Sequence, residues 1–412
     1  MKAALAPMRA PLRLISIACV FTTSVMQALA QFSSGSTGAD GALDILDPGT
    51  PTTIVFDPAV GDIRLDPDGD NVYHFTTITI PANVTLRLGA DVLGHTPVHW
   101  LASGAVRIEG TLDLNGQAGH ACGQPPVPGI AGAGGFNGGP AASESASGSA
   151  GDGPGGARYP GGGFDHAGHV TANGGAIYGN LYLMPLIGGS GGAGNGGPPG
   201  AGGGGGGGAI LIASDVSIDL PMGGSIRANG GNAGQQCTSD GTRGGAGSGG
   251  AIRLMAPRVT IGGSLSATGG AAPFSSASVG RIRIESFQRT LAGASISPGA
   301  SFGVPFQVFP PVSGPTVRVV SVAGVAVIPS PTGSFQMPDV TIEAVSAVPV
   351  ELSASNVPPG TILNLRFVPE TGDVITAMSS PLMGSFADST ASASVTFPRG
   401  FSRGYILATW TP

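Results

Sequence analysis

The chain has 412 residues, of which 73 are glycine and only 10% are charged, and its formal net charge is −6. Charged residues make up roughly 25% of an ordinary globular domain, so an ordinary domain is excluded, while 41% hydrophobic residues exclude a charge-rich disordered chain. Nucleic acid is not an expected partner, because Lys2 is the only lysine and the arginines do not cluster.

Residues 1–30 have the three parts of a secretory signal peptide. The positive start consists of Lys2, Arg9 and Arg13. An apolar stretch follows, and Ala28-Leu29-Ala30 supplies a cleavage site before Gln31. Cleavage there would leave 15 basic and 24 acidic residues, a net charge of −9. We expect a secreted, extracellular or cell-surface protein without membrane insertion, since no later apolar run approaches the roughly 20 residues that cross a bilayer.

Residues 31–304 contain an internal repeat. Similar copies occupy 100–119, 210–234 and 252–272, with a truncated copy at 279–287 and a half-copy at 77–90. Each full copy contains a short apolar strand, an alternating strand, a glycine turn and a third strand that ends on Asn-Gly or Thr-Gly. The copies are too short and too rich in glycine to be helices.

The alternation within these copies has a period of two. Val106 and Ile108 flank Arg107, and Ile282 and Ile284 alternate with arginines. One set of side chains therefore points inward in each strand. Such units bury their apolar face when they stack, so the repeat predicts a parallel β-helix-like solenoid, with a multi-sheet sandwich as the alternative.

A long glycine-rich insertion, at about 117–208, separates the first two full copies. It includes "AGAGGFNGG", "GDGPGG" and the seven-glycine run 202–208. This composition is typical of a flexible loop. It also permits tight backbone packing, and we expect partial order here.

The two cysteines of the mature chain lie at corresponding places in two copies. Cys122 is seven residues after Asn115, and Cys237 is eight residues after Asn229. If these copies stack, an oxidising compartment would let the thiols form a disulfide. The alternative is a pair of unpaired thiols in loops.

From about 312 to 412 the glycine density falls and short alternating strands follow one another. Val340, Ile342 and Ala344 begin this pattern. About seven strands in a hundred residues predict an immunoglobulin/fibronectin-like β-sandwich. Its expected core includes Phe367, Phe397, Tyr405 and Trp410.

Several phrases of the chain are distinctive in combination. They are "GADGALD", "VYHFTTITIPANVTLRLGA", "HWLASGAVRIEGTLDLNGQAG", "YGNLYLMPLIGGSGG" and "GGGGGGGAILIAS". On these phrases the chain resembles an uncharacterised group of secreted glycine-rich β-repeat proteins of environmental bacteria. The resemblance implies export and a β-rich repetitive fold, and it implies neither an activity nor catalytic residues.

The segment "LDPDGDN" at 65–71 is the best candidate for a metal site. Asp66, Asp68 and Asp70 at alternate positions could offer oxygen ligands to calcium. However, Asn71 replaces the glycine of an EF-hand-type loop, and Thr77 replaces its bidentate glutamate. A solvated Asp/Gly turn before the strand at Tyr73 is the alternative.

Other motifs point to chemistry less well. Asp165, His166 and His169 could contribute to a metal site, but they lie in glycine-rich sequence without an orienting element. His95 and His99 are interpreted as strand-edge residues. Gly-Gly-Ser-Gly-Gly at 188–192 matches a nucleophile elbow only by composition, since no helix or α/β sheet surrounds it. We therefore assign no catalytic and no cofactor-binding residues.

These observations favour a secreted or cell-surface structural or adhesion-type protein without catalytic activity, with surface glycans or extracellular matrix as partners. One alternative is a polysaccharide-active β-helix enzyme, a lyase or glycosidase, which needs clustered carboxylates. Glu109, Asp113 and Asp215 form no evident pair, and Arg107 and Arg253 are scattered. A carbohydrate-binding protein is the third possibility, although only 6% of the residues are aromatic.

Overall fold

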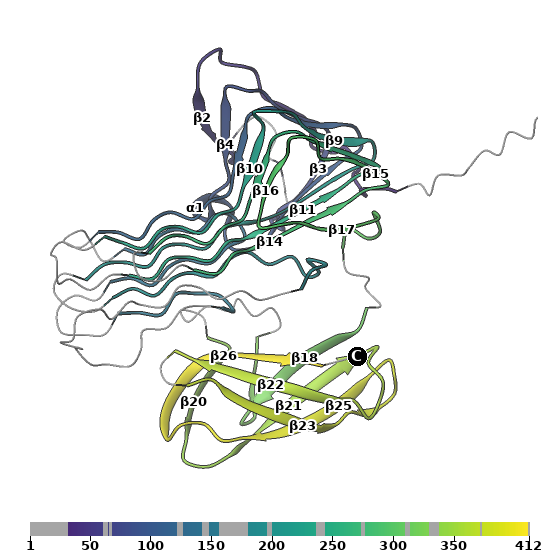
Figure 1. Cartoon of the computed structure of the whole chain (residues 1–412). Helices are drawn as coiled ribbons and strands as arrows, with labels where there is room; N and C mark the ends of the chain where they lie inside the picture. Colours follow the sequence, from purple (N-terminus) through teal and green to yellow (C-terminus); the bar gives the residue numbers. More distant parts are fainter. Residues whose placement is uncertain are drawn as a thin grey trace, which may run out of the picture. The chain divides into compact units, whose positions relative to one another are not determined.

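The structure of the chain is a computed structural model (Figure 1). It describes residues 32–60, 65, 68–121, 127–141, 148–155, 180–195, 200–235, 244–272, 277–309, 314–328, 338–370 and 373–410. These residues are mostly in strands or extended segments, with one short helix, α1 (Ala90–Leu93). None of the helices in these ranges is long and apolar enough to span a membrane.

Up to residue 303 the chain runs repeatedly through three parallel faces, and we call one passage a coil. The first face contains β5 (Val98–Ala102), β8 (Ala209–Ser214), β11 (Ala251–Met255), β14 (Arg281–Glu285) and β17 (Ser301–Gly303). The second face contains β6 (Val106–Ile108), β9 (Ser217–Leu220), β12 (Arg258–Ile261) and β15 (Gln288–Thr290). The third face contains β2 (Thr52–Val55), β4 (Val84–Arg87), β7 (Thr111–Asp113), β10 (Ser225–Arg227), β13 (Ser264–Ser266) and β16 (Ser295–Ser297).

The first two faces belong to one curled sheet, because β3 (Val72–Ile80) extends across the corner between them. Its first half pairs with β5 and its last residues pair with β6. β1 (Gly41–Asp44) pairs with β3 on the other side. Every one of these pairs is parallel, as the repeat predicts.

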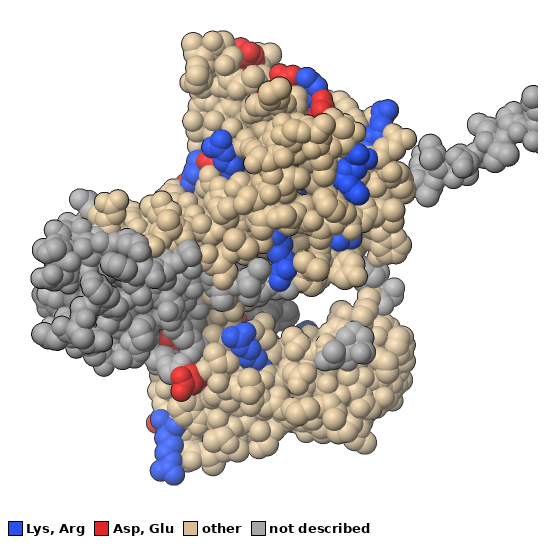
Figure 2. Space-filling model, viewed as in Figure 1, with Lys and Arg blue, Asp and Glu red and all other residues tan. Residues whose placement is uncertain are grey.

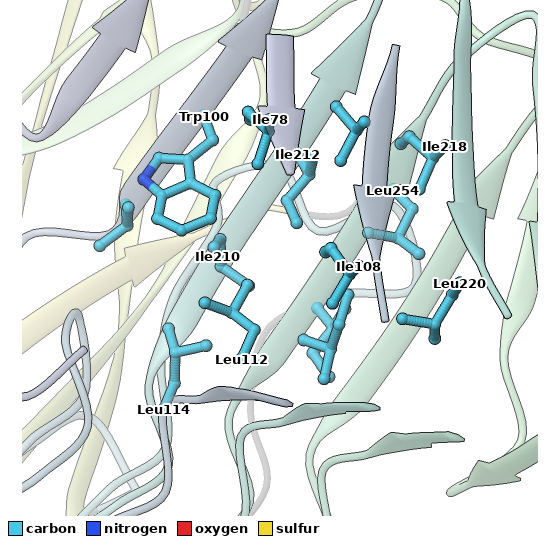
Figure 3. Packing of buried hydrophobic residues seen from close by; sticks show 14 of the residues in the cluster. Ile78, Trp100, Ile108, Leu112, Leu114, Ile210, Ile212, Ile218, Leu220 and Leu254 are labelled. Atoms are coloured by element: carbon cyan, nitrogen blue, oxygen red, sulfur yellow. The ribbon is translucent and has the colours of Figure 1, made fainter. Parts of the chain in front are cut away.

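The sequence copies stack in register. Trp100 pairs with Ile212, which pairs with Leu254 in the next coil. On the third face, Leu112 pairs with Ile226, and Ile226 with Leu265. Each of these side chains is at most 1% exposed, and Figure 3 shows several of them meeting in the interior of the coils. Like residues stack because each coil repeats the inward positions of the one before it.

The first face is buried on its outer side as well, unlike the other two. All six residues of β8 and all five of β11 are buried. Leu183 and Leu186 pack on its outer side, against Leu211 and Met255. This two-sided burial explains why "AILIAS" lacks the alternation of the other strands.

Residues 316–409 form a separate antiparallel part. Its first sheet contains β18 (Thr316–Val322), β19 (Val325–Ala326), β21 (Val348–Ser355), β24 (Met383–Gly384) and β25 (Ser389–Val395). Its second sheet contains β20 (Val340–Ala344), β22 (Ile362–Pro369), β23 (Ile375–Pro381) and β26 (Gly400–Thr409).

The two antiparallel sheets share one core. Leu352 of the first sheet and Leu365 of the second belong to the same buried cluster. Phe367 and Phe397 meet edge-to-face there, with ring centroids 4.7 Å apart. Trp410 packs partly buried against this cluster, whereas Tyr405 is buried in a smaller one. Parallel curled sheets followed by antiparallel sheets confirm the predicted β-rich class and are consistent with a solenoid followed by a sandwich.

Candidate functional site

Long glycine-rich segments leave the third face and return to the first face between successive coils. They occupy 114–121, 127–133, 135–141, 188–195, 200–208, 228–235, 244–250, 267–272 and 277–280, and a turn joins 127–133 to 135–141. Figure 1 shows them as long traces running side by side, away from the strands. We call these segments the glycine bundle. Their backbones are extended and hydrogen-bonded to one another, yet they do not form ordinary strands.

The hydrogen bonds of the central segment repeat every third residue. The N–H groups of Gly202, Gly205 and Gly208 donate to one neighbouring segment, at His120, Gln117 and Leu114. Those of Gly203 and Gly206 donate to a second segment, at Gly139 and Phe136. Those of Gly204 and Gly207 donate to a third, at Gly245 and Ser248. Three residues per turn without internal hydrogen bonds is the geometry of a polyproline II helix.

The carbonyl groups of the same segment accept from three further neighbours. The donors are Gly129, Gly132, Gly189, Gly192, Gly231 and Gly234. Segment 200–208 is therefore surrounded by hydrogen-bonded segments on all sides, and its backbone is satisfied although it is in no sheet.

Glycine is required in this packing because the segments approach backbone to backbone. A Cβ added at Gly206 would lie 1.9 Å from the carbonyl oxygen of Gly189, and one at Gly205 would lie 2.4 Å from that of Ile130. The neighbouring backbone cannot move away without losing its own hydrogen bonds. This need resembles that of collagen, where only glycine fits at the crowded axis.

Asparagine side chains join the outgoing segments where the bundle begins. Asn115 Oδ1 accepts the N–H of Asn229 at 2.8 Å. Asn229 Oδ1 in turn accepts the N–H of Thr268 at 2.8 Å and its hydroxyl at 2.9 Å. The Asn-Gly and Thr-Gly pairs that end the sequence copies thus lie near the start of the outgoing segments, and the aligned copies meet there.

No family model, curated protein or solved structure matches the chain. The functional assignment therefore depends on the geometry of the chain itself.

The predicted calcium site is described only in part, because Asp66 lies outside the described residues. Asp68 is exposed in the turn, and Asp70 Oδ1 accepts the N–H of Val72 at 3.0 Å, at the start of β3. That contact is the ordinary behaviour of an aspartate in a turn. Within the described ranges, His, Cys, Asp and Glu do not gather in groups of three that could hold a metal ion.

Cys122 and Cys237 both lie outside the described residues, as do Asp165, His166 and His169. The segments that lead to the two cysteines are neighbours in the bundle. The N–H of Gly119 donates to the carbonyl of Asn232 at 2.8 Å. The disulfide stays a prediction.

Of the carboxylates considered for an enzyme, Glu109 and Asp113 lie beside arginines, whereas Asp215 Oδ1 accepts the N–H of Ser34. Arg107 on the second face donates from Nε to Glu109 Oε1 at 2.7 Å and also forms an ion pair with Asp219 of the next coil. Asp113 lies 3.7 Å from Arg87. Glu109 and Asp219 therefore share one guanidinium instead of flanking an open groove.

A buried charge cluster, which sequence inspection missed, lies on the outer side of the first face. Arg253 is 1% exposed, and its Nη2 lies 3.1 Å from Glu285 Oε2. The same guanidinium donates to the carbonyls of Gln307 at 2.7 Å and Val308 at 3.1 Å. Burial lowers the pKa of Arg253, and Glu285 opposes that shift. The cluster holds segment 304–309 over the sheet.

Arg283 extends this cluster. Its Nε forms an ion pair with Glu285, and its guanidinium lies over the ring of Tyr182, 5.0 Å from the centroid. With Arg253 it gives two positive charges around one carboxylate. Of the two arginines considered scattered, Arg253 lies beside Arg283 because the register of β11 and β14 pairs them, whereas Arg107 lies apart on the second face.

His99 corrects the interpretation of this histidine as a strand-edge residue. β5 lies between β3 and β8, so His99 is in the interior of the sheet. Its ring is 5.1 Å from that of Phe309, and burial lowers its pKa to about 4. His99 is therefore neutral at ordinary pH. His95 is exposed, and its Nδ1 is 2.5 Å from the carbonyl oxygen of Gly135.

Proposed function

We propose that the chain is a secreted or cell-surface structural protein of adhesion type, without catalytic activity. In this proposal a parallel β-helix-like solenoid is the scaffold for the glycine bundle, and an immunoglobulin/fibronectin-like sandwich follows it. The partners would be surface glycans or extracellular matrix.

The observation that carries the proposal is the three-residue hydrogen-bond repeat of segment 200–208. An inserted loop of such length is ordinarily costly to order. Here nearly every backbone group that is described in the central segment has a partner, so the bundle can be rigid and extended. A rigid projection presents contacts to a partner without an ordering cost on binding.

The chemistry of the described surface supports binding more than catalysis. Figure 2 shows broad uncharged areas with scattered basic and acidic groups, some of which touch one another. Gln117 and Asn232 lie on the bundle with accessible side chains, and amide groups can exchange hydrogen bonds with sugar hydroxyls. The carboxylates of Glu109 and Asp219, by contrast, are both engaged with Arg107.

The proposal is tested by glycan-array and matrix-protein binding with the purified mature chain. A Gly205→Ala variant, which disturbs the bundle, is compared with Gly299→Ala, where an added Cβ meets nothing within 4 Å. We expect binding that Gly205→Ala weakens at least tenfold and Gly299→Ala leaves unchanged. Release of oligosaccharides from a polysaccharide panel would instead favour the β-helix enzyme. Equal binding by the two variants would contradict a role of the glycine bundle in binding.

A further inference from the structure

The inward-facing side chains of successive coils form stacked series, and two of these series end at the last coil in an arginine and a phenylalanine. On the first face, the series Trp100, Ile212, Leu254 and Ile284 continues to Phe302 of β17. On the second face, the series Val106, Ile218 and Val259 continues to Arg289 of β15. Arginine therefore occupies a position that is aliphatic in the preceding coils.

These two side chains meet each other. The guanidinium carbon of Arg289 lies 4.4 Å from the centroid of the Phe302 ring. Since they come from different faces, the pair extends across the end of the apolar interior. Val259 and Ile284, one coil earlier, are at most 1% exposed, whereas Phe302 is 47% exposed.

The last coil needs protection because nothing follows it in the two sheets. β15, β16 and β17 are the terminal strands of the described sheets. Such strands offer unpaired backbone groups to another chain, and an inward-pointing charge is one device that prevents this pairing. An arginine can stay hydrated at its edge while its face covers an aromatic ring.

The opposite end of the coils shows what would dock here. Leu43 of β1 precedes Ile78 in the second-face series, and Ile54 of β2 precedes Leu86 in the third. Both are only partly buried. If a second copy continued the coils, its Leu43 would lie against residue 289 of the first copy. An aliphatic side chain at 289 would pack against Leu43, whereas the guanidinium of Arg289 would not.

We propose that Arg289 and Phe302 form a lid on the apolar interior that prevents a second copy of this chain from stacking, head to tail, on the last coil. The lid is independent of the function proposed above. Without the lid, the last coil of one copy could contact the first coil of the next. Such a head-to-tail contact does not close into a ring, so it would produce linear oligomers of increasing length.

Sedimentation velocity of the full mature chain tests the lid. We expect the native protein to be monomeric and Arg289→Val to associate in a concentration-dependent series. The matched control is Arg258→Val, which removes an exposed arginine from the same face one coil earlier, and it should stay monomeric. Adding Leu43→Asp to Arg289→Val should restore the monomer.

Three outcomes would overturn the lid: a native protein that already forms such series, a monomeric Arg289→Val, or association that Leu43→Asp does not reduce. Should Arg289→Val fail to fold, Phe302→Ala provides the second test, because it removes the ring and keeps the charge. It should remain monomeric with a lower Tm than the native protein, and an unchanged Tm would equally contradict the lid.

Discussion

Two basic side chains lie on the outer side of the first face. Arg253 is charged there, and His99 is neutral at ordinary pH. Arg253 has Glu285 within 3.1 Å and two carbonyl acceptors, so its charge is compensated. For His99, burial outweighs the nearby Asp70 and lowers its pKa to about 4. Burial lowers the pKa of both groups, but arginine starts from a far higher ordinary pKa and has Glu285 beside it, so only His99 becomes neutral.

Replacing Glu285 by Gln tests the buried cluster. Arg253 and Arg283 would lose their shared counter-charge, and breaking a buried pair from one side costs about 3–5 kcal/mol of unfolding free energy. Urea unfolding measures this loss. The control is Glu109→Gln, which disrupts an exposed pair and should cost at most about 1 kcal/mol; similar losses in both variants would contradict the role given to burial.

The pKa of His99 predicts a pH dependence of stability. Its folded pKa is about 4 and its ordinary value is 6.5, so between these values the unfolded chain binds a proton that the folded chain does not. Stability from this group is complete above pH 6.5 and is lost as the pH falls towards 4, by about 3 kcal/mol. Urea unfolding from pH 4 to 7 should show a smaller dependence of stability on pH in His99→Phe than in the native protein, and an equal dependence in both would contradict the prediction.

At the scale of elements, the strands and the glycine segments follow different periods. In the strands of the coils, inward and outward side chains alternate with a period of two. Stacking of the coils then places similar inward residues above one another. The bundle has a period of three, visible in glycines such as Gly129, Gly132, Gly135 and Gly138. Glycine at every third position was the signal that could have predicted the bundle.

Gly205→Ala should destabilise the bundle by about 3 kcal/mol or more, because its Cβ would lie 2.4 Å from the carbonyl oxygen of Ile130. Thermal unfolding and hydrogen exchange of the bundle amides measure the effect. Gly299→Ala should leave stability unchanged or raise it by about 0.5 kcal/mol, since the methyl group meets open space. Equal tolerance of both substitutions would be inconsistent with close backbone packing.

In the whole molecule, the segments of the glycine bundle connect the third face of each coil to the first face of the next, so the same chain forms both the coils and the bundle. The N–H of Gly208 donates to Leu114, the N–H of Ala251 donates to Gly208, and each residue lies where a strand and a bundle segment meet. The register of the coils therefore sets the order of the bundle segments, and an error in one would displace the other.

The predicted Cys122–Cys237 disulfide would join the outgoing segments of two different coils. In protein produced in an oxidising compartment, the thiols of Cys122 and Cys237 should react with an alkylating reagent only after reduction, as measured by intact mass. In the chain-entropy model such a link over about a hundred residues stabilises by about 5 kcal/mol, so reduction should lower Tm. Two thiols that alkylate without reduction would exclude the link.

Much of the coil could be predicted because alternation and repetition are properties of local sequence. Val106 and Ile108 reveal an inward set by themselves. The cluster of Arg253, Arg283 and Glu285 could not be predicted, since three charged residues in alternating strands look like an exposed face. Segments 304–309 and 182–186, both distant in sequence from Arg253 and Arg283, cover that face and bury the charges.

A glycine-rich repetitive β architecture and the positions of its inward residues could be predicted from the amino-acid sequence, because these depend on residue type and spacing along the chain. Tertiary structure decided which segments surround Gly205, which carboxylate meets Arg253 and where the stacked series end at Arg289. Those features depend on register between distant segments, and the same glycines could locally form a loop equally well.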